Sequence, residues 1–208
     1  VSISVLTCNT AAGSTVIKIN PLPAAIVASS QSICMGTSVA IGGTNVTTSS
    51  YAWTSNPSGF SSTVSNPSVS PTITTTYTLV ETVKATGCNK SNSVIITVSA
   101  LPLANAGTNS TICNGGSASI GASAVSGNTY SWTSSPAGFT STSANPSVSP
   151  TKTTTYTLTE TVTSTSCSNS NSVVITVNPI PATPKAFSNS PVCAGDSLKL
   201  TTATVSGA

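Results

Sequence analysis

Few side chains in this sequence could carry out acid–base chemistry. The 208 residues include no His and no Arg, and the only carboxylates are Glu81, Glu160 and Asp196. General acid–base catalysis would therefore fall to these acids or to the six Lys residues. Ser residues are abundant, but no histidine is available to activate one as a nucleophile. We therefore expect no catalytic residues, no cofactor and no enzymatic activity.

Two of the acids occupy equivalent positions in a repeated sequence. Glu81 recurs as Glu160, so the two do not form a designed pair within one site. Glu81 shares the parity of Tyr77 and Leu79, which are expected to face inward. Because an unpaired buried charge is costly, we expect these carboxylates at a rim or a bulge, where they accept backbone or hydroxyl hydrogen bonds. An unusual buried acid is the alternative.

Composition also limits the partners. The six cysteines show no C-x-x-C spacing and no His is present, which argues against a zinc site, and one acid per full repeat is too few for calcium. Without clustered Lys or Arg, nucleic acid is a poor partner. No apolar run reaches the length of a membrane span, and no signal peptide is visible, as expected for a segment from within a longer protein.

The elements that would position these side chains repeat with a step of 79 residues and no gap. Recurring pairs are Cys34 and Cys113, Tyr51 and Tyr130, Trp53 and Trp132, Phe60 and Phe139, Tyr77 and Tyr156, and Cys88 and Cys167. A fixed period of this size indicates an array of modules. We expect residues 1–20 to end a preceding repeat, 21–101 and 102–180 to form full Ig-like repeats, and 181–208 to begin a following repeat.

The modules are predicted to be all-β. Ser and Thr make up 77 of the 208 residues, apolar residues alternate among them, and no stretch has a helical period. In the second copy, the expected strands include residues 106–113, 117–120, 129–133, 153–163 and 173–177. About seven short strands per repeat, separated by turn signals, indicate an antiparallel β-sandwich.

Cysteine spacing predicts one disulfide per module. Cys34 and Cys88 are 54 positions apart, and so are Cys113 and Cys167. We expect the bridges Cys34–Cys88 and Cys113–Cys167, each tying the end of a first strand to the last hairpin. Closing such a loop contributes roughly 4 kcal/mol on the chain-entropy model. Disulfides also indicate a location outside the reducing cytosol.

The remaining two cysteines, Cys8 and Cys193, fall in the partial repeats. We expect each to be unpaired within this sequence or bonded to a neighbouring module. Reactive free thiols are the alternative, although no basic group lies nearby in the sequence to lower a thiol pKa.

The aromatic residues allow two interpretations. Tyr51 and Trp53 share one strand face and could form an exposed platform for sugars, as could Tyr130 and Trp132. A Trp on the third strand that packs in the core is more typical of Ig sandwiches. The expected core aromatics are Tyr51, Trp53, Tyr77, Tyr130, Trp132 and Tyr156. Phe60 and Phe139, beside Pro-x-Gly turns, are expected to be partly exposed.

Several motifs together resemble a known family. They are Thr111-Ile112-Cys113-x-Gly115, Tyr130-x-Trp132, Asn145-Pro146, residues 153–159, Cys167, and Val173-Val174-Ile175-Thr176-Val177. The set is similar to PKD-like or Ig-like repeats of large secreted surface proteins from Bacteroidota. The resemblance covers both full copies and both partial ends. It implies β-sandwich arrays in giant adhesins, including gliding-motility adhesins exported by the type IX system.

Candidate glycosylation sites follow from short motifs. Asn45, Asn89 and Asn109 match the N-glycosylation sequon. Asp196-Ser197-Leu198 resembles an O-glycosylation motif of Bacteroidota, which makes Ser197 a candidate.

We therefore expect a structural function. The array would form a disulfide-stiffened stalk or fibre in an extracellular filament or cell-surface adhesin, with short Pro-bearing linkers that limit bending. Its partners would be adjacent repeats and, through low charge, other copies of the chain. The alternative is a repeated glycan- or surface-binding module. A stalk predicts that no pocket with convergent polar groups recurs between modules, and a sugar reader predicts exposed Tyr or Trp.

Overall fold

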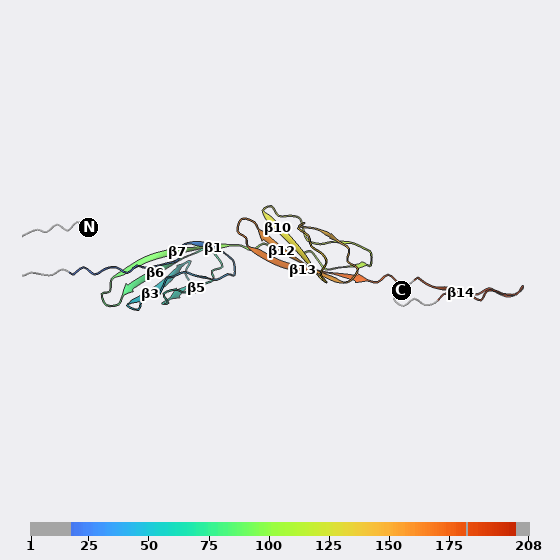
Figure 1. Ribbon diagram of the computed structural model, residues 1–208, viewed down its shortest axis with the longest axis horizontal. Coiled ribbons are helices and arrows are strands. Elements are labelled where there is room, and N and C mark those ends of the chain that lie inside the picture. The colour runs from blue at the N-terminus through green and yellow to red at the C-terminus, as the bar shows by residue number, and fades with distance from the viewer. Residues whose placement is uncertain (1–17, 182, 203–208) are drawn as a thin grey trace, which may run out of the picture. The chain divides into compact units, whose positions relative to one another are not determined.

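The computed structural model describes residues 18–181 and 183–202 (Figure 1). These residues form strands and no helix, which confirms the predicted all-β class. The chain divides into two compact units, residues 1–99 and 100–208, and each contains one full copy of the repeat. The expected end of a preceding repeat, with Cys8, lies almost entirely outside the described residues.

The first module builds a five-stranded sheet in the order β1-β7-β6-β3-β4, together with a separate β2-β5 pair. Its strands are β1 (Gln31–Cys34), β2 (Val39–Ala40), β3 (Ser49–Asn56), β4 (Ser61–Ser62), β5 (Ser68–Val69), β6 (Thr75–Val83) and β7 (Asn89–Ser99). The core joins residues of β3, β6 and β7 to Ile41 and Val69 from the β2-β5 side. This arrangement is the expected two-sheet sandwich.

The second module repeats the plan with a four-stranded sheet, β10-β12-β13-β8, and a β9-β11 pair. Its strands are β8 (Ser110–Cys113), β9 (Ala118–Ser119), β10 (Asn128–Ser135), β11 (Ser147–Val148), β12 (Thr154–Val162) and β13 (Ser168–Asn178). The strand that would correspond to β4 is reduced to one bridge between Trp132 and Ser141. After this module, β14 (Ala186–Ser188) and β15 (Leu200–Thr202) form an antiparallel pair with exposed side chains.

Alternation along the long strands explains the layers. On β6, Tyr77, Leu79 and Glu81 are buried, whereas the residues between them face outward or are half-buried. β12 follows the same pattern. Because successive side chains of a strand point to opposite faces, this pattern supplies one apolar face for the core and one hydroxyl-rich face for solvent.

The first strand of each module runs parallel to the last strand. In the first module Cys34 lies opposite Ser99, the final residue of β7, and in the second Cys113 lies opposite Asn178, the final residue of β13. The other strand pairs in the described residues are antiparallel. The first-strand cysteine therefore lies where the chain leaves its module.

The predicted bridges Cys34–Cys88 and Cys113–Cys167 are wrong. Cys34 and Cys167 are disulfide-bonded, whereas Cys88 and Cys113 are free thiols. Each predicted pair lies at opposite ends of the module's last strand, which has 11 residues. At about 3.3 Å per residue the cysteines are separated by roughly 35 Å, and a disulfide requires Cα atoms within about 7 Å of each other. One internal bridge per module is thus excluded by the fold.

Two neighbouring residues of β6 test the register of this strand. Leu79 is fully buried and Val80 is 37% exposed. We expect Leu79→Ala to lower the free energy of unfolding by about 2–5 kcal/mol, because it leaves a cavity. Val80→Ala is expected to cost less than about 1 kcal/mol. Urea denaturation of the two variants checks this. The opposite ranking would mean that the strand is shifted by one residue.

Candidate functional site

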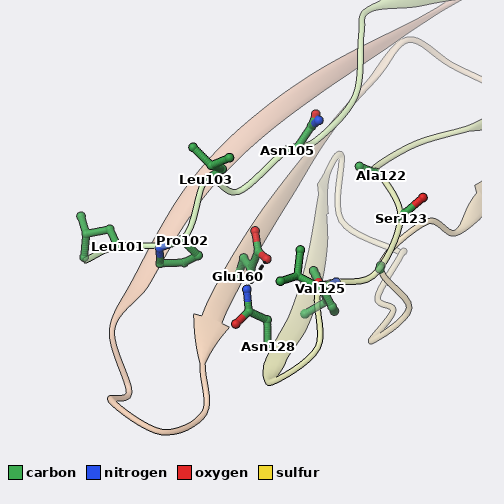
Figure 2. A pocket seen from close by; sticks show the side chains of 11 residues that line it. Leu101, Pro102, Leu103, Asn105, Ala122, Ser123, Val125, Asn128 and Glu160 are labelled. Atoms are coloured by element: carbon green, nitrogen blue, oxygen red, sulfur yellow. Dashed lines mark hydrogen bonds between the residues drawn. The ribbon is translucent and has the colours of Figure 1, made fainter. Parts of the chain in front are cut away.

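The most distinctive polar group in each module is a buried carboxylate. Glu160 of β12 is 4% exposed. The backbone N–H of Ala104 donates to Glu160 Oε2 at 2.9 Å, and Asn128 Nδ2 donates to Oε1 at 2.7 Å. Figure 2 shows Asn128 and Glu160 side by side, with the linker residues Pro102 and Leu103 next to them. Both carboxylate oxygens are therefore occupied by donors from the same module.

The first module contains the equivalent contact. Ala25 N–H donates to Glu81 Oε2 at 2.7 Å, and Glu81 is also 4% exposed. Ala25 and Ala104 are fully buried and have φ values of 51° and 50°, in the left-handed region. The expected position at a rim or bulge is wrong, because the carboxylate faces inward from a regular strand. The expected hydrogen bond to the backbone is present, and it holds the entry linker against the sheet.

A pocket of about 340 Å³ lies beside Glu160 (Figure 2). Its walls include the apolar side chains of Leu101, Leu103 and Val125. Its acid and amide, Glu160 and Asn128, are hydrogen-bonded to each other. The pocket therefore offers apolar contact but no free general acid or base.

A second pocket recurs in both modules at positions that differ by the repeat length. We call it the turn groove. It is lined in the first module by Pro57, Gly59, Phe60, Pro71 and Tyr77, and in the second by Pro136, Gly138, Phe139, Pro150 and Tyr156, among others. The volumes are about 340 Å³ and 370 Å³. The stalk interpretation predicted that no pocket with convergent polar groups would recur between modules. Because the turn groove recurs, it is a specific candidate binding site for the alternative, a repeated binding module.

An aromatic pair contributes to the lining of each turn groove. Phe60 contacts Tyr77 edge to face with ring centroids 5.3 Å apart, and Phe139 contacts Tyr156 in the same way at 5.2 Å. The tyrosines are buried, and burial raises the pKa of both hydroxyls above the ordinary value. Both phenylalanines are partly buried and pack against their own core. The exposed lining residues include prolines, glycines and hydroxyl residues, together with Ile73 in the first groove and Lys152 in the second.

The tryptophans form no exposed platform. Trp53 and Trp132 are each 1% exposed, and their Nε1 atoms donate to Val64 O at 3.0 Å and Ser143 O at 2.9 Å. They are core residues, so a sugar platform at these positions is excluded.

The tyrosines next to them support loops. Tyr51 is buried and Tyr130 is half-buried. The backbone N–H of Val46 donates to Tyr51 Oη at 2.7 Å, and that of Val125 donates to Tyr130 Oη at 2.6 Å. Each hydroxyl therefore fixes the loop that precedes its own strand.

The candidate modification residues lie at the surface. Asn45, Asn89, Asn109 and Ser197 are all exposed. The side chain of Asn109 also has a structural role, since its Oδ1 accepts a hydrogen bond from Val174 N–H at 2.9 Å.

Three further observations concern metal ligands, buried polar groups and membrane spans in the described part of the chain. These residues contain no group of three or more His, Cys, Asp or Glu side chains that could hold a metal ion. Every buried side-chain nitrogen or oxygen among them has a hydrogen-bond partner. The same residues provide no helix long and apolar enough to cross a membrane. Cys193 is exposed and has a free thiol.

These features define the chain as a tandem of Ig-like β-sandwich modules. The family model "Ig-like domain CHU_C associated" matches residues 100–179, which is the whole second module. The first module has the same order for its four main strands, β1-β7-β6-β3 against β8-β13-β12-β10, and the linker–glutamate and Trp–carbonyl hydrogen bonds recur in it 79 residues earlier. No curated protein matches the chain.

Solved structures with similarity to the chain include Ig and fibronectin(III)-like modules. The I-band fragment I67–I69 from titin is 12% identical, covering 87% of this chain and 75% of that chain with a TM-score of 0.38. The Ig1-2 module of Drosophila receptor protein tyrosine phosphatase DLAR is 11% identical, covering 73% and 96% with a TM-score of 0.30. The fibronectin(III)-like modules of Clostridium thermocellum CbhA are 12% identical, covering 73% and 90% with a TM-score of 0.34. At these TM-scores the similarities carry no argument about function.

The buried carboxylate contact can be tested at Glu160. We expect Glu160→Ala to lower the free energy of unfolding by about 1–3 kcal/mol, because Ala104 N–H and the Asn128 amide lose their acceptor inside the module. Glu160→Gln keeps an acceptor and is expected to cost less. Urea denaturation measures the change, and amide hydrogen exchange at Ala104 localises it.

The matched control is Thr161→Ala, which changes the next residue on the less buried side of β12. It is expected to leave exchange at Ala104 unchanged. Full protection of the Ala104 amide in Glu160→Ala would contradict the assigned role of the carboxylate.

Proposed function

We propose that this chain is part of a stalk or fibre of tandem Ig-like modules in an extracellular filament or cell-surface adhesin. The observation that carries this proposal is that the buried polar contacts recur between modules. The Glu–Ala, Trp–carbonyl and Tyr–loop hydrogen bonds each appear twice, 79 residues apart. Their repeated role is to fix linkers and loops, which favours mechanical support over catalysis.

The strand arrangement suits a load-bearing role. The chain enters each module before its first strand and leaves it after its last strand, and these two strands are parallel. A pull on both ends moves the two strands in opposite directions along their length. The hydrogen bonds between them are then loaded in shear and resist together, because each lies across the direction of pull.

One side chain extends this ladder in each module. Ser30 Oγ accepts from Ile95 N–H at 3.0 Å, and Asn109 Oδ1 accepts from Val174 N–H at 2.9 Å at the equivalent place. At the other end, Met35 N–H donates to Ser99 O at 2.9 Å. The terminal strands are therefore joined beyond their four paired positions.

The surface supports close packing of chains. Charged residues are few, and exposed hydroxyls pair across β12 and β13 instead, with 3.0 Å between Thr157 Oγ1 and Ser172 Oγ and between Thr159 Oγ1 and Ser170 Oγ. Low charge removes repulsion between neighbouring chains. Lateral association of chains into fibres is therefore part of the proposal.

The bonded state of Cys34 and Cys167 supports a location outside the reducing cytosol.

Single-molecule stretching tests the load-bearing ladder. We expect Asn109→Ala to lower the unfolding force of the second module, because it removes a hydrogen bond worth about 0.5–1.5 kcal/mol from the sheared pair. The first module is the internal control and should unfold at its original force. Ser30→Ala should instead lower the unfolding force of the first module and leave that of the second module unchanged. Unchanged forces in both variants would contradict loading through these strands.

The turn groove favours a second candidate function, recognition of surface glycans by each module. Its proline and hydroxyl groups recur in both copies, but Ile73 of the first groove is replaced by Lys152 in the second. We expect a glycan reader to show saturable amide shifts at both Gly59 and Gly138 when titrated with neutral oligosaccharides. Phe139→Ala should abolish the shifts in the second module only. The absence of saturable shifts would leave the mechanical function alone.

A further inference from the structure

The two cysteines of each module lie at opposite ends of that module. The exit cysteine, Cys34 or Cys113, is opposite the last residue of the last strand. The other cysteine, Cys88 or Cys167, is in the hairpin before the last strand, where its carbonyl accepts a hydrogen bond from Val83 or Val162 N–H at 2.9 Å. We call it the entry cysteine.

The hairpin that carries this second cysteine lies beside the linker through which the chain enters the module. Asn169, two residues after Cys167, donates from Nδ2 to Pro102 O at 3.0 Å. In the first module Asn92, four residues after Cys88, donates from Nδ2 to Ala25 O at 3.1 Å. Each module therefore carries one cysteine where its chain enters and one where its chain leaves.

Both positions occur in a bonded and a free state in this chain. The exit cysteine is bonded at Cys34 and free and exposed at Cys113. The entry cysteine is bonded at Cys167 and free and partly buried at Cys88. Because the two positions of one module are roughly 35 Å apart along a strand, neither can reach the other within its own module. The bonded state of each position shows that the position is suited to a disulfide.

We propose that disulfides in this protein join module to module, with the exit cysteine of one copy bonded to the entry cysteine of another copy. Cys113 and Cys88 are then the free cysteines of the two full modules. Cys113 takes the entry cysteine of a further module, and Cys88 takes the exit cysteine of a further module. The partner is a second copy of the repeat, in the same chain or in another chain. This inference extends the proposed stalk, since it places covalent bonds at the ends of modules.

The chemistry is thiol–disulfide exchange with a disulfide oxidant, such as oxidised glutathione. The Cys113 thiolate attacks the oxidant, forms a mixed disulfide and releases one reduced thiolate. The thiolate of an entry cysteine then attacks the Cys113 sulfur and releases the second. Two protein thiols are oxidised, one oxidant disulfide is reduced to two thiols, and the two protein protons pass to those thiols.

A complementation experiment tests the pairing rule. Cys8 and Cys193 are first replaced by Ser so that the cysteines of the partial repeats do not interfere. This protein, treated with oxidised glutathione, is expected to form a ladder of covalent multimers on a non-reducing gel. Peptide mapping should place the linkage between Cys113 and Cys88 of different chains.

Two variants in this background separate directed pairing from random oxidation. Cys88→Ser leaves Cys113, an exit cysteine, as the free thiol, and Cys113→Ser leaves Cys88, an entry cysteine. Each alone is expected to stay monomeric, and an equimolar mixture should give dimers in several-fold excess over either alone. Equal amounts of dimer in the separate variants, or no multimer from the protein with both cysteines, would overturn the proposal.

Mapping of the unaltered chain gives a second readout. Every bridge is expected to join an exit cysteine to an entry cysteine of a different copy. A Cys34–Cys88 or Cys113–Cys167 peptide would also overturn the rule. Because these measurements need no applied force, the pairing rule can fail while the load-bearing function stands, and the reverse is equally distinguishable.

Discussion

The interaction on which each module depends is the hydrogen bond from a linker amide to a buried glutamate. A charge removed from water must be compensated, and here the backbone N–H of Ala25 or Ala104 compensates it at short range. The contact joins residues 56 positions apart and holds an alanine in the left-handed region. It thereby fixes where the chain enters the sandwich, just before the first strand pairs with the last.

The small number of charged residues also determines the character of the module surface. With so few ionic groups, the modules expose hydroxyls, and these pair across strands, as Thr157 does with Ser172. Such a surface gives neither a steering field nor strong repulsion between copies. A sandwich with a fixed entry, a parallel terminal pair and a surface with few charges is suited to repetition in an array, which connects the local hydrogen bonds to the proposed mechanical role.

The cysteines show where sequence reasoning failed. In a repeat, Cys34 and Cys88 recur with unchanged spacing, so the spacing identifies equivalent positions but cannot say which cysteines meet. Distance along the chain is also a poor guide, because an 11-residue strand separates the two cysteines of a module. The glutamate gave a mixed signal, because its parity on the strand pointed inward whereas the cost of an unpaired buried charge led us to expect a rim or bulge. Nothing in the sequence named Ala104 as the partner of Glu160. The turn groove was missed because its lining comes from two separate segments, residues 55–60 and 70–77 in the first module, and the fold rather than any sequence motif brings them together.

The sequence by itself determined the modules, their all-β class, the strands and the aromatic core, because period and alternation are local properties of the chain. Residues such as Trp53 and Leu79 had to be inside wherever the strands lay. Only the tertiary structure decided which distant groups meet: the linker amide meets the glutamate, and the first strand pairs with the last. It also placed the two cysteines of each module at opposite ends of that module. These outcomes depend on strand direction and register, which bring some distant residues together and hold others a full strand length apart.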